Sequence, residues 1–249
     1  MNRLVNKRAF VTGGTRGIGK AICIELAKEG ANVAFTYRKS KALAVELVQE
    51  LKGYGVQSFS FQADVCDRVE LKKAYSIIDK EWNGLDILVN NAGINKPTDF
   101  DQISDKDWDE ILTVNLKGPF VCTQEALPLL RLSSSASIVN IGSVSGQYGG
   151  PRTAHYAASK AGLISLSQVI ARFGAKDKIR SNTLAAGIIS SDMGADGLKS
   201  PAVAKAAASI MLGELGSYDD VAKAAVFLAS DESCYITAQT INVNGGIYF

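Results

Sequence analysis

The stretch Thr12-Gly-Gly-Thr-Arg-Gly-Ile-Gly19 lies between a short apolar run and a segment whose apolar residues recur at helical spacing. The run at 8–12 predicts a buried strand, the segment after it predicts a helix over 17–29, and 31–37 predicts a second strand. A glycine turn between strand and helix lets the backbone approach a pyrophosphate, and the helix N-terminus offers it unpaired N–H groups. The stretch therefore predicts a dinucleotide-binding turn in a protein of the α/β class.

Strands and helices continue to alternate along the chain without a linker, which predicts one domain over 1–249. The alternation favours a doubly wound parallel sheet with the ligand at the carboxyl ends of its strands. Strands are expected at 8–12, 31–37, 56–63, 85–90, 136–141, 179–184 and 240–243. Helices are expected at 17–29, 41–52, 68–82, 107–132, 153–173 and 219–230. The irregular segment 190–216, rich in Ala, Gly and Ser, is predicted to be a lid over the substrate.

The composition is that of an ordinary globular protein, with 47% hydrophobic and 21% charged residues and a net charge of +2. Lys and Arg are scattered, so no nucleic-acid surface is expected. No apolar run reaches the length of a membrane span, and the first residues lack the core of a signal peptide, so we expect a cytoplasmic protein. The four cysteines have no metal-ligand spacing and are expected to be free thiols, with no metal bound. They are Cys23, Cys66, Cys122 and Cys234.

Tyr156 and Lys160 are four residues apart, and Ser143 lies thirteen residues before the tyrosine. On a helix this spacing places both side chains on one face, with Cβ atoms about 5–6 Å apart. A nearby cation lowers the pKa of a phenol from about 10 toward neutrality. The pair alone is common on solvated helix surfaces. Together with the glycine turn, it indicates proton transfer at a carbonyl or carbinol.

These motifs together resemble the short-chain dehydrogenase/reductase family. The T-G-x3-G-x-G turn is followed in the family's order by N-N-A-G at 90–93, Asn115 in V-N-L, Ser143 in I-G-S-V-S, and the Y-x3-K pair. N-x-K-G-P-F, F-L-A-S-D-E and the closing T-I-N-V-N-G-G-I-Y-F are most similar to bacterial 3-oxoacyl-[acyl-carrier-protein] reductases. The resemblance implies a Rossmann-type sheet of seven strands in the order 3-2-1-4-5-6-7, with helices on both faces.

The resemblance also implies a catalytic set of Asn115, Ser143, Tyr156 and Lys160. Hydride would pass from a nicotinamide to a ketone carbon, Tyr156 would supply the proton, and Ser143 would stabilise the oxyanion. Lys160 would lower the phenol pKa and hold the nicotinamide ribose. Asn115 would kink its helix and fix a water that connects Lys160 to solvent.

The choice of cofactor depends on the end of the second strand, where NAD enzymes of this architecture carry an acidic residue. Tyr37 is at that position and Arg38 follows it, while Arg16 lies in the glycine turn. A 2′-phosphate requires cations and is repelled by a carboxylate, so NADP(H) is expected. The expected cofactor contacts, several of them implied by the resemblance, are Gly13, Thr15, Arg16, Gly17, Ile18, Gly19, Tyr37, Arg38, Asp64, Val65, Asn91, Ala92, Gly93, Tyr156, Lys160, Gly187, Ile189 and Ser191.

The substrate is left open between a carrier-bound and a free ketone. The favoured hypothesis is an NADPH-dependent reductase of 3-oxoacyl chains on a carrier protein or coenzyme A. The stretch Arg131-Leu-Ser-Ser-Ser has three serines where the carrier reductases tend to have a basic run, and Lys176 and Lys178 are the possible substitutes. The alternatives are the same chemistry on a sugar, steroid or secondary metabolite, and a non-catalytic paralogue that binds nucleotide.

Two further expectations concern surfaces. Relatives of this type form homotetramers of 222 symmetry, in which Leu163, Leu166 or Ile170 would face a partner helix and residues 247–249 would be buried at an interface. The alternative is that the C-terminal residues fold back on their own subunit. His155, the only histidine, is expected at a pocket wall or the surface rather than in catalysis.

Overall fold

The computed structural model describes residues 2–190 and 201–249. Its sheet has seven strands in the order β3-β2-β1-β4-β5-β6-β7, and every neighbouring pair is parallel. The strands are β1 (Arg8–Val11), β2 (Asn32–Tyr37), β3 (Ser58–Gln62), β4 (Ile87–Asn90), β5 (Ala136–Ser143), β6 (Ile179–Ala186) and β7 (Thr240–Val243). The predicted fold class and strand order are confirmed.

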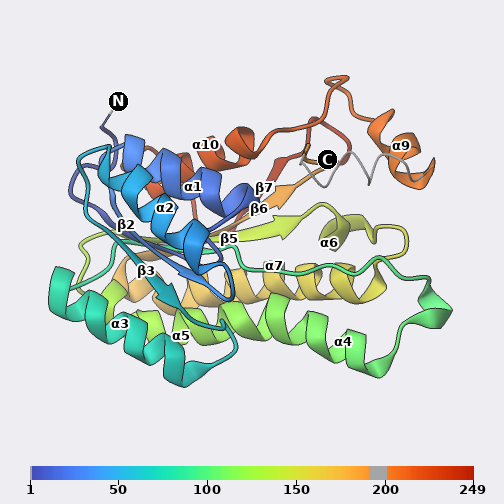
Figure 1. Ribbon diagram of the computed structural model, residues 1–249. Coiled ribbons are helices and arrows are strands. Elements are labelled where there is room, and N and C mark those ends of the chain that lie inside the picture. Colours follow the sequence, from blue (N-terminus) through green and yellow to red (C-terminus); the bar gives the residue numbers. More distant parts are fainter. Residues whose placement is uncertain (1, 191–200) are drawn as a thin grey trace.

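Helices cover both faces of the sheet (Figure 1). One face carries α1 (Gly17–Lys28), α2 (Lys41–Lys52) and α10 (Tyr218–Ala229), and the other carries α3 (Arg68–Trp82), α5 (Gly118–Leu130) and α7 (Ala154–Gly174). Each layer has its own hydrophobic core, so the inner strands are apolar on both sides. Two shorter helices, α6 (Ser145–Tyr148) and α9 (Pro201–Ala207), lie toward the carboxyl ends of the strands.

The single helix predicted over 107–132 is divided in the structure. α4 (Asp105–Leu112) is followed by a π-helical turn at Thr113–Lys117 and then by α5. The Gly118 amide donates to the Thr113 carbonyl five residues back, which defines the wider turn. α4 begins two residues before the predicted start, where the Ser104 side chain accepts from the Asp107 amide and caps the helix. The π turn contains Asn115.

The prediction of which residues face a partner helix is wrong in part, while the burial of residues 247–249 at an interface stays a prediction. Leu163 and Ile170 are buried within their own subunit, and Leu166 packs partly buried against the same core, so Leu163 and Ile170 are not free to face a partner helix. Tyr248 stacks on Tyr148 of the same chain with ring centres 5.6 Å apart, which is the fold-back alternative. Phe249 is 94% exposed.

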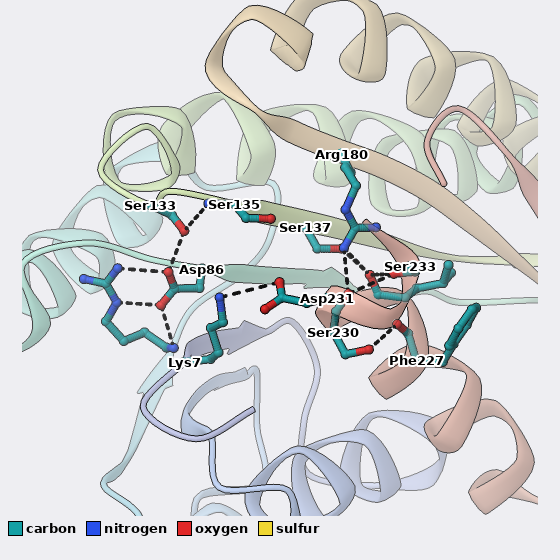
Figure 2. A network of polar contacts seen from close by, with 12 residues as sticks. Lys7, Asp86, Ser133, Ser135, Ser137, Arg180, Phe227, Ser230, Asp231 and Ser233 are labelled. Atoms are coloured by element: carbon teal, nitrogen blue, oxygen red, sulfur yellow. Dashed lines mark hydrogen bonds and ion pairs between the residues drawn. The ribbon is translucent and has the colours of Figure 1, made fainter. Parts of the chain in front are cut away.

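A network of polar contacts joins the loops at the amino ends of the strands, the end of the sheet away from the glycine turn (Figure 2). Asp86 accepts from the Arg8 side chain at 2.7 and 3.0 Å and from the Ser133 hydroxyl at 2.6 Å. Arg180 donates to the carbonyls of Leu228 and Ser230 at the end of α10, at 2.9 and 3.2 Å. These bonds hold loops at the amino ends of the strands, whereas the ligand site is expected at the carboxyl ends.

The described residues contain no helix long and apolar enough to cross a membrane. Within that part of the chain, no three or more His, Cys, Asp or Glu side chains are grouped to hold a metal ion. The four cysteines are free thiols, of which Cys234 is exposed.

Candidate active site

The glycine turn follows β1 at the centre of the sheet, where the strand order reverses between β1 and β4. Gly13 and Gly17 have φ of +69° and +55°, which favour glycine. A Cβ atom on Gly19 would lie 2.2 Å from the Gly13 carbonyl oxygen, so no side chain fits there. Arg16 precedes α1 without a side-chain capping bond, and so leaves the first amides of the helix available to an anion.

Thr12 and Asn91 fasten this turn to the end of β4. The Thr12 hydroxyl accepts from the amides of Asn91 and Ala92, both at 3.0 Å. The Asn91 side chain donates to the carbonyls of Thr12 and Gly13 at 2.9 and 3.1 Å. The Asn91 side chain therefore orients the glycine turn, a role that sequence reasoning missed.

At the end of β2, Tyr37 and Arg38 lie where the sequence places them. The Tyr37 ring packs in the core beside α1 and α2, and the Arg38 side chain is about half exposed. The Arg38 guanidinium is 4.0 Å from the Asp64 carboxylate, a weak and solvated ion pair. Arg16 is exposed on the neighbouring turn. Two cations without a strong carboxylate partner fit a 2′-phosphate.

The remaining expected cofactor residues lie around the same end of the sheet. A Cβ atom on Gly187 would approach Asn244 to 2.7 Å, and Ile189 is bridged to Gly216. Val65 is buried and packs against Gly118, the first residue of α5. Ser191 lies outside the described residues, as does the first part of the predicted lid, residues 191–200. The positions on the turn and the adjoining strand end are Gly13, Thr15, Arg16, Gly17, Ile18, Gly19, Ala92 and Gly93.

Ser143, Tyr156 and Lys160 are brought together by β5 and α7. Ser143 is the last residue of β5, and its hydroxyl is hydrogen-bonded to the Tyr156 phenol in the first turn of α7. The Lys160 Nζ atom donates to the Ile141 carbonyl at 2.7 Å and lies 5.7 Å from the centre of the Tyr156 ring. All three polar groups face one site beside the glycine turn. Gly93 lies beside Lys160 and Asn115, since a Cβ atom there would lie 3.6 Å from Lys160 Nζ and 3.3 Å from Asn115 Oδ1.

The electrostatics of this site differ from the prediction. Burial raises the pKa of Tyr156, and the hydrogen bond with Ser143 offsets only part of that rise. Burial also lowers the pKa of Lys160 to about 8. The predicted lowering of the phenol pKa toward neutrality is therefore wrong, because the ammonium is bonded to the Ile141 carbonyl and burial dominates at the phenol.

Asn115 uses its side chain to join two segments. Its Oδ1 accepts from the Ile94 amide at 2.8 Å, and its Nδ2 donates to the Ile94 carbonyl at 2.9 Å and to Ser159 Oγ at 3.1 Å. Ser159 in turn donates to the Tyr156 carbonyl at 2.7 Å. The side chain thus positions the loop after β4 and the first turns of α7. Its expected part in holding a water stays a prediction.

His155 is fully buried rather than at the surface. Its Nδ1 accepts from the Tyr156 amide at 2.9 Å, so it contacts the backbone of the tyrosine and not the phenol. Sequence reasoning missed this contact because neighbouring residues of a helix point about 100° apart.

Comparison with known proteins agrees with this architecture. The family model described as Enoyl-(Acyl carrier protein) reductase matches residues 13–248. A 3-oxoacyl-[acyl-carrier-protein] reductase FabG from Staphylococcus aureus (strain Mu50) is 43% identical over 244 residues, covering 98% of this chain and 99% of the relative. The FabG of Thermotoga maritima is 38% identical over 245 residues, with the same coverage.

Solved structures give the same result. A short-chain dehydrogenase from Burkholderia cenocepacia in complex with NADP has a TM-score of 0.91 at 34% identity, covering 98% of this chain and 99% of that one. A blue fluorescent protein from a metagenomic library in complex with NADPH has a TM-score of 0.92 at 34% identity, covering 99% and 100%. The site geometry and these matches lead to one conclusion: this chain belongs to the short-chain dehydrogenase/reductase family.

Proposed function

We propose that this chain is an NADP(H)-dependent ketone reductase that converts a 3-oxoacyl substrate into the 3-hydroxyacyl product. The observation that carries the proposal is the hydrogen bond between the Ser143 hydroxyl and the Tyr156 phenol, with the Lys160 ammonium 5.7 Å from the ring, beside a glycine turn. The FabG relatives are named for this substrate class, which supports the acyl assignment.

NADP(H) is the cofactor, and its nicotinamide supplies or accepts the hydride when bound. Arg16 and Arg38 would receive the 2′-phosphate, the first amides of α1 the pyrophosphate, and Lys160 the nicotinamide ribose. The two solved neighbours named with NADP or NADPH support this choice.

The chain's own groups handle the proton. The raised pKa of Tyr156 keeps the phenol protonated at neutral pH, as a proton donor for ketone reduction must be. Ser143 donates a hydrogen bond to the oxygen that becomes negative. With its pKa at about 8, Lys160 remains mostly charged near neutrality and stabilises the phenolate left after transfer.

One observation favours the alternative of a free ketone. Arg131, the basic residue left before β5, donates to Asp177 at 2.9 Å and lies 5.7 Å from the centre of the Phe173 ring. This pairing reduces the positive charge that an acidic carrier would meet. We hold the free-ketone reductase as the second candidate.

The free thiols fit a reducing compartment, and we propose the cytoplasm as the place of action.

A substrate panel followed by NADPH absorbance tests the proposal. The panel contains 3-oxoacyl chains on carrier protein and on coenzyme A, together with free cyclic ketones, keto sugars and keto steroids. We expect the highest kcat/KM for a 3-oxoacyl thioester. A free ketone that exceeds it tenfold would establish the second candidate. NADPH binding without turnover of any substrate would indicate a non-catalytic nucleotide binder.

A further inference from the structure

The helix that carries Tyr156 starts without an ordinary cap. Thr153 occupies the N-cap of α7, but its hydroxyl donates backward to the Gly150 carbonyl at 3.0 Å and makes no capping bond. The first amides of any helix have no partner one turn earlier and need one from elsewhere. The Tyr156 amide is one of these groups.

His155 supplies that partner from inside the first turn. Its ring is fully buried, and its Nδ1 accepts from the Tyr156 amide at 2.9 Å. A ring nitrogen that accepts a hydrogen bond carries no proton, so the proton of the neutral imidazole is on Nε2. The buried Nε2 has no hydrogen-bond partner among the residues that the structure describes. The hydrogen bond to Tyr156 therefore orients this ring.

Tyr156 is consequently held at three atoms. His155 holds its amide, Ser159 holds its carbonyl at 2.7 Å, and Ser143 is hydrogen-bonded to its phenol. The carbonyl anchor is itself fixed, since Asn115 donates to Ser159. Loss of the amide anchor would leave the first turn of α7 free to shift. A shift of a fraction of an ångström at the phenol is enough to slow proton transfer.

We propose that His155 is a positioning residue for the reaction, whose unprotonated Nδ1 fixes the backbone of Tyr156 and through it the phenol. The kinetic part of this inference rests on the proposed ketone reduction, while the hydrogen bond itself can be tested without turnover. His155 does not touch substrate or the reacting atoms in this role.

Two substitutions separate positioning from packing. Asn places its Oδ1 as many bonds from the backbone as Nδ1 of His, so His155→Asn keeps the acceptor, whereas His155→Leu removes it. For His155→Leu we expect kcat to fall roughly tenfold while KM and NADPH affinity stay within about twofold. We expect His155→Asn to restore kcat to within about threefold of the wild type. Thr153→Val, which alters the same helix start without touching the Tyr156 amide, serves as the matched control and should leave kcat nearly unchanged.

A double-mutant cycle tests whether His155 acts through Tyr156. In the Tyr156→Phe background, His155→Leu should cause no further loss of kcat, because no phenol is left to position. A full tenfold additional loss would overturn the proposal, as would a kcat for His155→Asn as low as that for His155→Leu.

The single histidine also permits a direct test by NMR on the whole protein. One set of imidazole nitrogen signals should show the tautomer protonated at Nε2, with Nδ1 as acceptor. A ring protonated at Nδ1 would overturn the proposal even if every variant were active. If the wild type reduced no ketone in the panel, the proposed function would fail, and the tautomer would still decide the hydrogen bond.

Discussion

Lys160 and Ile141 join α7 to β5 through one hydrogen bond, in which the buried Lys160 Nζ donates to the Ile141 carbonyl at 2.7 Å. Ile141 is two residues before Ser143 on the same strand, so the bond sets the distance from the ammonium to the serine as well as to the phenol. A buried ammonium tied to a neutral carbonyl loses hydration without gaining a counter-charge, which explains a pKa of about 8. In the proposed reaction, the phenolate formed by proton transfer would provide that counter-charge.

Tyr156→Phe removes the proton donor and keeps the ring. We expect turnover to fall by roughly 10²–10⁴, the usual contribution of a positioned acid or base, with NADPH affinity little changed. Steady-state kinetics and nucleotide titration measure the two effects. Tyr148→Phe, the same chemical change on the neighbouring α6, should stay active. A Tyr156→Phe enzyme with more than about a tenth of wild-type turnover would contradict the assignment.

The sequence predicted those parts of the site that depend on local spacing. Tyr156 and Lys160 share a helix face because they are four residues apart, and the glycine turn is recognisable because a strand and a helix flank it. The bond from Lys160 to Ile141 and the bonds from Asn115 to Ile94 and Ser159 join residues that only tertiary packing brings together.

The resemblance implied a kink at Asn115, but the π turn that forms it and the direction of the phenol pKa shift were not predicted, and both for the same reason. Local propensity favours a continuous helix through Asn115, and the partners that stabilise its buried amide are distant in the sequence. The pKa prediction considered the neighbouring cation alone. Burial, which depends on the whole fold, decided the direction.

Arg38→Ala tests cofactor selection. Loss of this cation should weaken NADPH binding several-fold and leave NADH binding nearly unchanged, because only NADPH carries the 2′-phosphate. Adding Tyr37→Asp should shift preference further toward NADH, since a carboxylate repels the phosphate and accepts from a 2′-hydroxyl. The Tyr37 ring is largely buried, so thermal stability of the double variant must be measured beside its kinetics. A wild type that already prefers NADH would refute the reading of Arg16 and Arg38.

Lys176 and Lys178 test docking of an acidic carrier. Both are exposed beyond the end of α7, and Lys176 lies 5.7 Å from the centre of the Phe173 ring. Reversal of both to Glu should raise KM for carrier-bound substrate, more strongly at low salt, and leave a small ketone unaffected. Reversal of the exposed Lys72 and Lys73 on α3 is the matched control. Equal effects on both substrates, or none, would remove these lysines as the docking site.

Asp86→Asn tests how much the Arg8–Asp86 ion pair, at the amino ends of the strands, contributes to stability. Burial raises the pKa of Asp86, but hydrogen bonds from Arg8 and Ser133 outweigh it, and the net shift is downward. Loss of the carboxylate would leave the largely buried Arg8 guanidinium without its counter-charge, although its bonds to the carbonyls of Trp82 and Asn83 remain, so we expect the free energy of unfolding to fall by about 2–4 kcal/mol. The kcat of the folded variant should be unchanged.

Acidification should reproduce part of this loss in the wild type. Because the folded-state pKa of Asp86 is depressed, its contribution is complete above the ordinary aspartate pKa of about 4 and disappears as pH falls through the folded value. Denaturant unfolding as a function of pH measures it. The difference in stability between wild type and Asp86→Asn should shrink at low pH. A constant difference would show that the charge of Asp86 is not the cause.

The last prediction is the homotetramer of 222 symmetry, with a contact face different from the one first expected. Leu163 and Ile170 are buried within their own subunit, whereas Phe120 on α5 and Val169 and Phe173 on α7 are about half exposed. Large apolar side chains exposed on two neighbouring helices are costly in water and favour burial against a second copy. We expect light scattering to give four times the 26.4 kDa of one chain. Val169→Glu should reduce that mass, because it places a charge in the contact. Val69→Glu, at an equally exposed valine on α3, should not reduce it. A wild-type mass near that of one chain would overturn the prediction. It would favour the alternative in which the C-terminal residues fold back on their own subunit, as Tyr248 does on Tyr148.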